Sequence, residues 1–267
     1  MLGAIAGDII GSIYEWNNVK TTDFPLFKRR SHFTDDTVMT LAVAKWLLED
    51  EGHSSEYLVK CMRELGQKYF RAGYGGRFRK WLVSEDLKPY HSYGNGSAMR
   101  VSPVALYADS LEEALELAKI SASVTHDHRE GIWGAQAVAA CIYMNKTGQS
   151  KEEIKKFVTE HYGYNLNRTI DEIRPEYHFD VTCTGSVPQA IIAFLEGQNC
   201  EETIRLAISI GGDSDTIACI AASIAAAGKD KTTASLSKEI EEECIKRLPD
   251  DLRDILERFE RLVEQRV

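Results

Sequence analysis

Apolar residues recur at helical spacing along almost the whole chain, and this pattern predicts an all-α fold. The clearest run covers 38–50, while 130–146 is typical of a buried, Ala-rich helix and 250–265 of an amphipathic one. The short alternation at 177–181 is the best strand signal, and one short strand cannot form a sheet. No linker or internal repeat interrupts the pattern, so we expect one compact multi-helix domain spanning 1–267.

Several predicted helices begin at side chains that favour helix N-termini. Ser110–Glu113 and Ser150–Glu153 have the spacing of a capping box, in which Ser and Glu satisfy each other's backbone N–H groups. Asn199 is a further N-cap, and Pro188 suits the first turn of a helix. Because functional residues concentrate on loops held by a rigid scaffold, the Gly-rich stretches are candidate site loops. They are residues 72–76, 91–97, 184–186 and 211–212.

Composition narrows the classes of partner. The formal net charge of −9 argues against strong nucleic-acid binding or binding to a membrane surface. The apolar N-terminus contains Asp8 and lacks a basic segment, so it is a poor signal peptide, and the apolar stretch 217–227 is too short to span a bilayer. The six cysteines are scattered without a CxxC pair, and three of them, Cys141, Cys219 and Cys244, fall in helical patterns typical of small buried thiols. We expect a cytoplasmic protein, and a monomer.

Two acidic clusters, at 34–37 and 213–216, are the strongest chemical signal in the chain. Oxygen atoms this dense repel one another unless a hard cation neutralises them. Thr and Asp also cap helices, so capping alone is the alternative for the first cluster, although its residues exceed what one cap needs. Without paired His or Cys nearby, the donor set favours Mg²⁺ or Mn²⁺ over zinc. The predicted metal ligands are Thr34, Asp35, Asp36, Asp213, Asp215 and Thr216.

Other candidate residues carry weaker signals. The loop Ser92–Ser97 is rich in glycine, and such loops expose backbone N–H groups that hold phosphate; an ordinary tight turn is the alternative. Glu15 stands beside aromatic residues and is either a solvated surface residue or a general acid–base group. His126 and His128 have weak zinc spacing, and surface histidines are the alternative.

These blocks, in this order, resemble the dinuclear-magnesium ADP-ribosylglycohydrolases. The resemblance implies an all-α fold, two Mg²⁺ ions (or Mn²⁺), and release of ADP-ribose from ADP-ribosylated proteins or related conjugates. The form of the first block is closer to the ADP-ribosylserine hydrolases than to the arginine branch. The blocks are Gly7-Asp8, Gly11-Ser12-Ile13-Tyr14-Glu15, Phe33-Thr34-Asp35-Asp36-Thr37, Ser92-Tyr93-Gly94-Asn95-Gly96-Ser97-Ala98-Met99-Arg100, Thr125-His126 and Ser209-Ile210-Gly211-Gly212-Asp213-Ser214-Asp215-Thr216-Ile217.

The resemblance also assigns roles to individual residues. It implies that the two acidic clusters hold the metal pair from opposite sides, with Asp215 as a candidate bridge. It implies catalytic roles for Glu15, Asp35 and Asp215. The residues that it places along the ADP-ribose groove are Ser92, Tyr93, Gly94, Asn95, Gly96, Ser97 and His126.

Two other functions are compatible with the same residues. A dinuclear metal site can also hydrolyse a phosphoryl bond, which would make the chain a phosphohydrolase. A member without catalytic activity could instead only bind ADP-ribose. The sequence does not determine which ADP-ribose linkage is cleaved, because serine, arginine, nucleic-acid and acetyl conjugates share the half that these motifs recognise.

Overall fold

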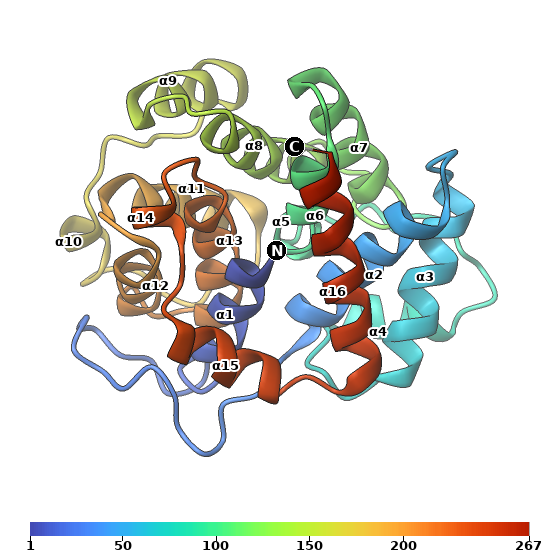
Figure 1. Ribbon diagram of the computed structural model, residues 1–267, viewed down its shortest axis with the longest axis horizontal. Coiled ribbons are helices and arrows are strands. Elements are labelled where there is room, and N and C mark those ends of the chain that lie inside the picture. Colours follow the sequence, from blue (N-terminus) through green and yellow to red (C-terminus); the bar gives the residue numbers. More distant parts are fainter. Residues whose placement is uncertain (267) are drawn as a thin grey trace.

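The computed structural model describes residues 1–266, which fold into helices joined by turns and loops (Figure 1). In the first half these are α1 (Leu2–Gly11), α2 (Asp35–Glu49), α3 (Ser55–Lys68), α4 (Gly76–Val83), α5 (Gly96–Met99), α6 (Ser102–Tyr107), α7 (Leu111–Ser123) and α8 (Arg129–Lys146). The second half has α9 (Lys151–Tyr162), α10 (Ile170–Ile173), α11 (Cys183–Glu196), α12 (Cys200–Ser209), α13 (Ser214–Ala226), α14 (Lys231–Ala234), α15 (Lys238–Lys246) and α16 (Asp250–Gln265). The described residues contain no strand, which confirms the all-α fold.

Helix α1 packs against α13 at the centre of the molecule (Figure 1). Three glycines of α1, four residues apart, face the α13 backbone; they are Gly3, Gly7 and Gly11. A Cβ atom at Gly7 would collide with the carbonyl of Ala218, and one at Gly11 would lie 2.5 Å from the Cα of Asp215. Glycine is therefore required for the close approach of the two helices, and this approach brings the acidic residues of α1 and α13 together.

The C-terminal helix α16 packs across α2, which bears the first acidic cluster (Figure 1). Its buried face consists of Leu252, Ile255, Leu256 and Phe259, and the opposite face is charged. This confirms the amphipathic helix predicted at 250–265, whose apolar face packs on the core.

Most of the predicted helix caps are present. Ser150 and Glu153 form a complete capping box, and the Asn199 side chain accepts from the backbone N–H of Glu202. The other predicted box is only half formed. Ser110 accepts from the N–H of Glu113, but the Glu113 carboxylate accepts from the N–H of Asp109 instead of that of Ser110.

The prediction for Pro188 is wrong, because it lies inside α11 instead of in its first turn. The helix begins earlier, at Cys183, since the Thr182 hydroxyl accepts from the N–H of Gly185 and caps it there. The stretch 184–186 is consequently helical and is not the loop that its glycine suggested.

The six cysteines are buried and unpaired. Across residues 1–266, every helix is too short or too polar to cross a membrane. The short alternation at 177–181 is an irregular segment, and an isolated bridge between Gly94 and Thr182 directly follows it.

Candidate active site

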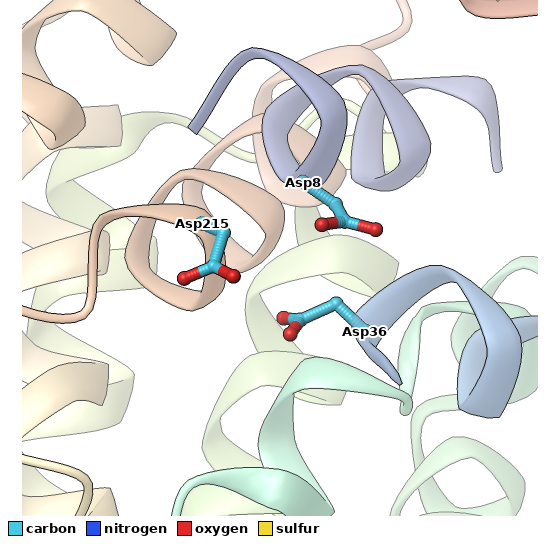
Figure 2. Close-up of side chains that lie close together, drawn as sticks. All are labelled: Asp8, Asp36 and Asp215. Atoms are coloured by element: carbon cyan, nitrogen blue, oxygen red, sulfur yellow. The ribbon is translucent and has the colours of Figure 1, made fainter. Parts of the chain in front are cut away.

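Three helices each direct one aspartate toward a common point: Asp8 on α1, Asp36 on α2 and Asp215 on α13 (Figure 2). One carboxylate oxygen from each lies within 4.8 Å of the others. A second group with the same spacing combines Glu15, Asp213 and Asp215. Asp215 therefore belongs to both groups, as a residue that bridges two cations would.

Asp8 fixes the beginning of α2. Its carboxylate accepts from the backbone N–H groups of Thr34 and Thr37, at 2.9 and 3.1 Å, and from both of their hydroxyls. Most of its acceptor capacity is thus used to orient the acidic cluster that follows. Asp8 is not among the ligands expected from the motifs. A charge in the middle of an apolar helix is the signal that could have identified it, because buried charges need partners.

Two carboxylate oxygens in this cluster are buried and lack a hydrogen-bond partner: Oδ1 of Asp36 and Oδ1 of Asp215. The other oxygen of Asp36 accepts from the Thr216 hydroxyl at 3.2 Å. Buried acceptors without partners are costly, so a ligand that satisfies both is expected. Carboxylate and hydroxyl oxygens are the donors that hard divalent cations prefer, and the residues present fit such an ion.

The charges in this cluster are mutually unfavourable. Burial raises the pKa of Asp36 well above its ordinary value, and the carboxylates of Asp8 and Asp35 raise it further. Burial likewise raises the pKa of Asp215, with Asp213 as the next cause. Without a cation, these groups ionise only at the expense of stability.

Asp35 occupies a different position from the other acids. It lines the cavity described below but belongs to neither group of three carboxylates. Its backbone N–H donates to the carbonyl of Ala72 at 2.8 Å, and its side chain lies against Gly73. Burial, followed by the charge of Asp8, raises the pKa of Asp35.

Glu15 lies on the irregular segment between α1 and α2. Burial and the neighbouring Asp213 carboxylate raise the pKa of Glu15 to about 7, while the Trp16 side chain opposes the rise by hydrogen bonding. The Asn18 side chain donates to the Glu15 carbonyl at 2.8 Å and to that of Gly212 at 3.0 Å, which ties the segment to the turn before α13. Glu15 is therefore able to exchange a proton near neutral pH.

Asn95 connects the Gly-rich loop to the acidic site. Its side-chain nitrogen donates to Asp213 Oδ2 at 2.6 Å and to the Ser186 hydroxyl at 2.9 Å. Its backbone N–H donates to the carbonyl of Val181 at 2.8 Å. The loop is thus held from both sides, and its amide orients a carboxylate of the second acidic group.

A cavity of about 580 Å³ opens beside the acids. It is lined by both acidic clusters, Glu15 and much of the Gly-rich loop. The predicted site residues among its walls are Glu15, Thr34, Asp35, Asp36, Ser92, Gly94, Asn95, Gly96, His126, Asp213, Asp215 and Thr216.

Two predicted groove residues do not line this cavity. The Tyr93 ring is half exposed and packs against the His128 ring, with centroids 5.4 Å apart. The Ser97 hydroxyl is buried and donates to the carbonyl of Gly131 at 2.7 Å. Ser97 thus supports the loop from behind, and Tyr93 lies beside the cavity on its outer surface.

His126 is buried against the Gly-rich loop. Its Nδ1 lies 2.7 Å from the Thr125 hydroxyl, and a Cβ atom at Gly96 would lie 3.2 Å from its Nε2. Burial and then the charge of Arg100 hold the pKa of His126 well below its usual range, so the ring is neutral. His128 instead caps α8 by accepting from the N–H of Glu130. Neither histidine belongs to a group of three possible metal ligands within residues 1–266.

Part of the cavity wall comes from the Gly-rich stretch 72–76, which the sequence predicted as a site loop. Gly75 and Gly76 lie at the beginning of α4, where no side chain caps the helix. Arg77 follows, and its guanidinium lies over the Tyr90 ring at 5.0 Å. Uncapped N–H groups and an arginine make this wall suitable for an anion.

Known proteins resemble the chain along most of its length. A model of the family described as ADP-ribosylglycohydrolase matches residues 1–266. ADP-ribosylhydrolase ARH3 from Homo sapiens is 26% identical over 321 residues, covering 90% of this chain and 88% of that protein. An uncharacterized protein from Archaeoglobus fulgidus is 34% identical over 72% of this chain and 70% of its own length. A solved structure, of an ADP-ribosylglycohydrolase-related protein complex, is similar in fold with a TM-score of 0.71 at 23% identity, covering 98% of this chain and 95% of that chain.

Proposed function

The chain belongs to the ADP-ribosylglycohydrolase family of glycosidase-type hydrolases, and on that premise we propose that it releases ADP-ribose from ADP-ribosylated acceptors in a reaction that requires Mg²⁺. The observation that carries the proposal is the arrangement of the acids. Two groups of three carboxylates share Asp215, and all of their members except Asp8 line one cavity of about 580 Å³ together with the Gly-rich loop. A cavity of this size accommodates a nucleotide-sized ligand.

The residues that would hold two Mg²⁺ ions lie at the beginnings of two helices, α2 and α13. They are Thr34, Asp35, Asp36, Asp213, Asp215 and Thr216, with Asp215 shared. Asp8 would act through Thr34 and Thr37, because its carboxylate is already occupied by their hydrogen bonds. When bound, such a pair of ions orients hydroxyl groups of the substrate and stabilises charge that develops on oxygen. Mn²⁺ accepts the same donors and is the alternative ion.

Glu15 would manage the proton during bond cleavage. Breaking a glycosidic bond to ribose develops positive charge at the anomeric carbon and negative charge on the leaving atom. Glu15 lines the cavity beside the proposed metal ligands and would donate a proton to the leaving atom; a water molecule would then form the new bond to the anomeric carbon and return a proton to Glu15. The carboxylates of Asp213 and Asp215 lie beside it and would stabilise the positive charge.

The pyrophosphate would lie between two sets of backbone N–H groups. One set belongs to the Gly-rich loop at Gly96, and the other to the uncapped beginning of α4 at Gly76. Arg77 supplies positive charge on the same side, and the neutral ring of His126 adds no charge of its own.

The test is a panel of ADP-ribose conjugates linked through serine, arginine, nucleic acid and acetyl groups. Each is incubated with protein and Mg²⁺, and free ADP-ribose and inorganic phosphate are both measured. We expect ADP-ribose from at least one conjugate, and none from Glu15→Gln protein with an unchanged circular dichroism spectrum. Phosphate as the product would identify a phosphohydrolase, and turnover by Glu15→Gln at the wild-type rate would contradict the role of Glu15.

The compartment and oligomeric state form a further part of the proposal. Six buried, unpaired cysteines suit the cytoplasm, where thiols remain reduced. We propose a cytoplasmic monomer, and light scattering at micromolar concentration would reveal any larger assembly.

A further inference from the structure

Two exposed aromatic side chains meet at the rim of the cavity. Trp16 directly follows Glu15 and is 76% exposed, and Phe179 is 46% exposed. Their rings stack with centroids 5.3 Å apart and planes 23° from parallel, and both line the cavity. Large aromatic groups this open to water are uncommon, and these two pack on each other instead of on the core. Their contact therefore joins two segments that are distant in the sequence.

The segment that carries Glu15 has other attachments, which hold its backbone. Asn18 donates to the carbonyls of Glu15 and Gly212, and Lys20 Nζ donates to the carbonyl of Ile210 at 2.6 Å. None of these bonds reaches the Glu15 carboxylate. Trp16, in contrast, is next to Glu15 in the sequence, and the two residues line the same cavity. Trp16 is thus the neighbour placed to set the direction of the Glu15 side chain.

Phe179 is held by the opposite side of the site. The carbonyl of Val181, two residues further on, accepts from the N–H of Asn95 at 2.8 Å. The N–H of Cys183 donates to the carbonyl of Tyr93 at 3.0 Å. The segment that carries Phe179 is therefore hydrogen-bonded to the loop that carries Asn95, whose side chain donates to Asp213.

We propose that the stack of Trp16 and Phe179 is a clasp that holds the Glu15 carboxylate beside Asp213 and Asp215. The two aromatic residues are then positioning residues for the reaction, an inference that rests on the proposed function. A glutamate on an irregular segment otherwise samples many orientations, and small displacements of a reacting group cost large factors in rate. Opening the clasp lowers the rate of the chemical step without removing a contact to the substrate.

The test compares three variants, using the conjugate that wild-type protein hydrolyses fastest. Phe179→Ala removes the stack, and we expect kcat to fall about 10- to 100-fold while KM changes less than about threefold. Phe179→Tyr keeps a stacking ring and should restore kcat to within about threefold of wild type. His161→Ala is the matched control, because His161 also stacks on an aromatic ring, at 4.0 Å from Phe157, and does not line the cavity.

Hydrogen exchange supplies a readout that does not depend on turnover. Peptides covering 12–20 should exchange several-fold faster in Phe179→Ala than in wild type, and at the wild-type rate in His161→Ala. Unchanged kcat and unchanged exchange in Phe179→Ala would overturn the clasp, as would a raised KM with unchanged kcat, which indicates direct contact with the substrate. A wild-type protein that releases ADP-ribose from no conjugate contradicts the proposed function instead, and hydrogen exchange then still decides whether the clasp exists.

Discussion

The acid cluster and the aromatic rim belong to one cavity but are built from different kinds of structure. The acids lie on helices α1, α2 and α13 and are buried, and α1 packs closely on α13 through its glycines. Trp16, Phe179 and Tyr93 instead lie on irregular segments and are largely open to water. The acids are therefore placed by the core of the protein, while the rim depends on a few local contacts. Changes in the first region should affect metal binding or folding, and changes in the second should affect activity alone.

The largest effect is expected from Asp215, which belongs to both acidic groups. Asp215→Asn should lower the rate of ADP-ribose release by about a thousandfold or more, because the shared ligand is lost. It also removes one of several buried like charges, so thermal stability without metal should be unchanged or higher. Differential scanning fluorimetry in the presence of EDTA measures this stability. A melting temperature below that of wild type would contradict the inference that these buried carboxylates repel one another.

A substitution at Gly7 should break the fold and the site together. In Gly7→Val the new side chain collides with the α13 backbone, and we expect a loss of about 3 kcal/mol in the free energy of unfolding. Urea denaturation measures this loss. Gly52→Ala is the control, since a Cβ atom there meets only the Asp50 side chain at 3.4 Å, and it should stay within about 0.5 kcal/mol of wild type.

Asn95 connects the Gly-rich loop to the acid cluster, and its substitution should have an effect of intermediate size on kcat. Asn95→Asp removes the donor to Asp213 and adds a like charge, so kcat should fall about 100-fold. Ser186→Ala removes only the other partner of that amide and should lower kcat less than about fivefold. Equal effects of the two variants in the same hydrolysis assay would show that the bond to Asp213 is unimportant.

The dependence of stability on pH should change with metal. The folded pKa of Glu15, about 7, lies above its ordinary value of 4.5, and burial shifts Asp36 and Asp215 in the same direction. The native state therefore binds more protons than the unfolded state in this range, so metal-free protein loses stability as pH rises from 4.5 through 7. Mg²⁺ competes with those protons, and its effect on melting temperature should be larger at pH 8 than at pH 5. An increase in melting temperature with Mg²⁺ that is the same at pH 5 and pH 8 would contradict this competition.

The smallest effect is expected at the outer surface of the rim. Tyr93→Ala removes a ring that packs on His128 and does not line the cavity. Calorimetry should show ADP-ribose affinity reduced by less than about tenfold, with Mg²⁺ binding unchanged. A loss of Mg²⁺ binding in Tyr93→Ala would show that a change in the aromatic rim also disturbs the acid cluster.

Much of the fold and part of the site could be predicted from local pattern. Helical spacing gave the all-α class, and the caps at Ser150 and Asn199 were placed correctly. Pro188 was misplaced because Thr182 began the helix earlier, a competition between two start signals that local pattern does not rank. Asp8 was missed as a site residue because its importance depends on helices that meet it from elsewhere in the chain.

The sequence by itself determined the helices, the donor chemistry of the two acidic clusters and the family to which the chain belongs. The helices and the donor chemistry follow from residue types at short spacing, and the family follows from a resemblance over most of the chain. Only the tertiary structure decided that α1 approaches α13 closely enough to bring Asp8 and Asp215 together, and that Trp16 stacks on Phe179. Those contacts join distant segments, and their geometry depends on how all the helices pack at once.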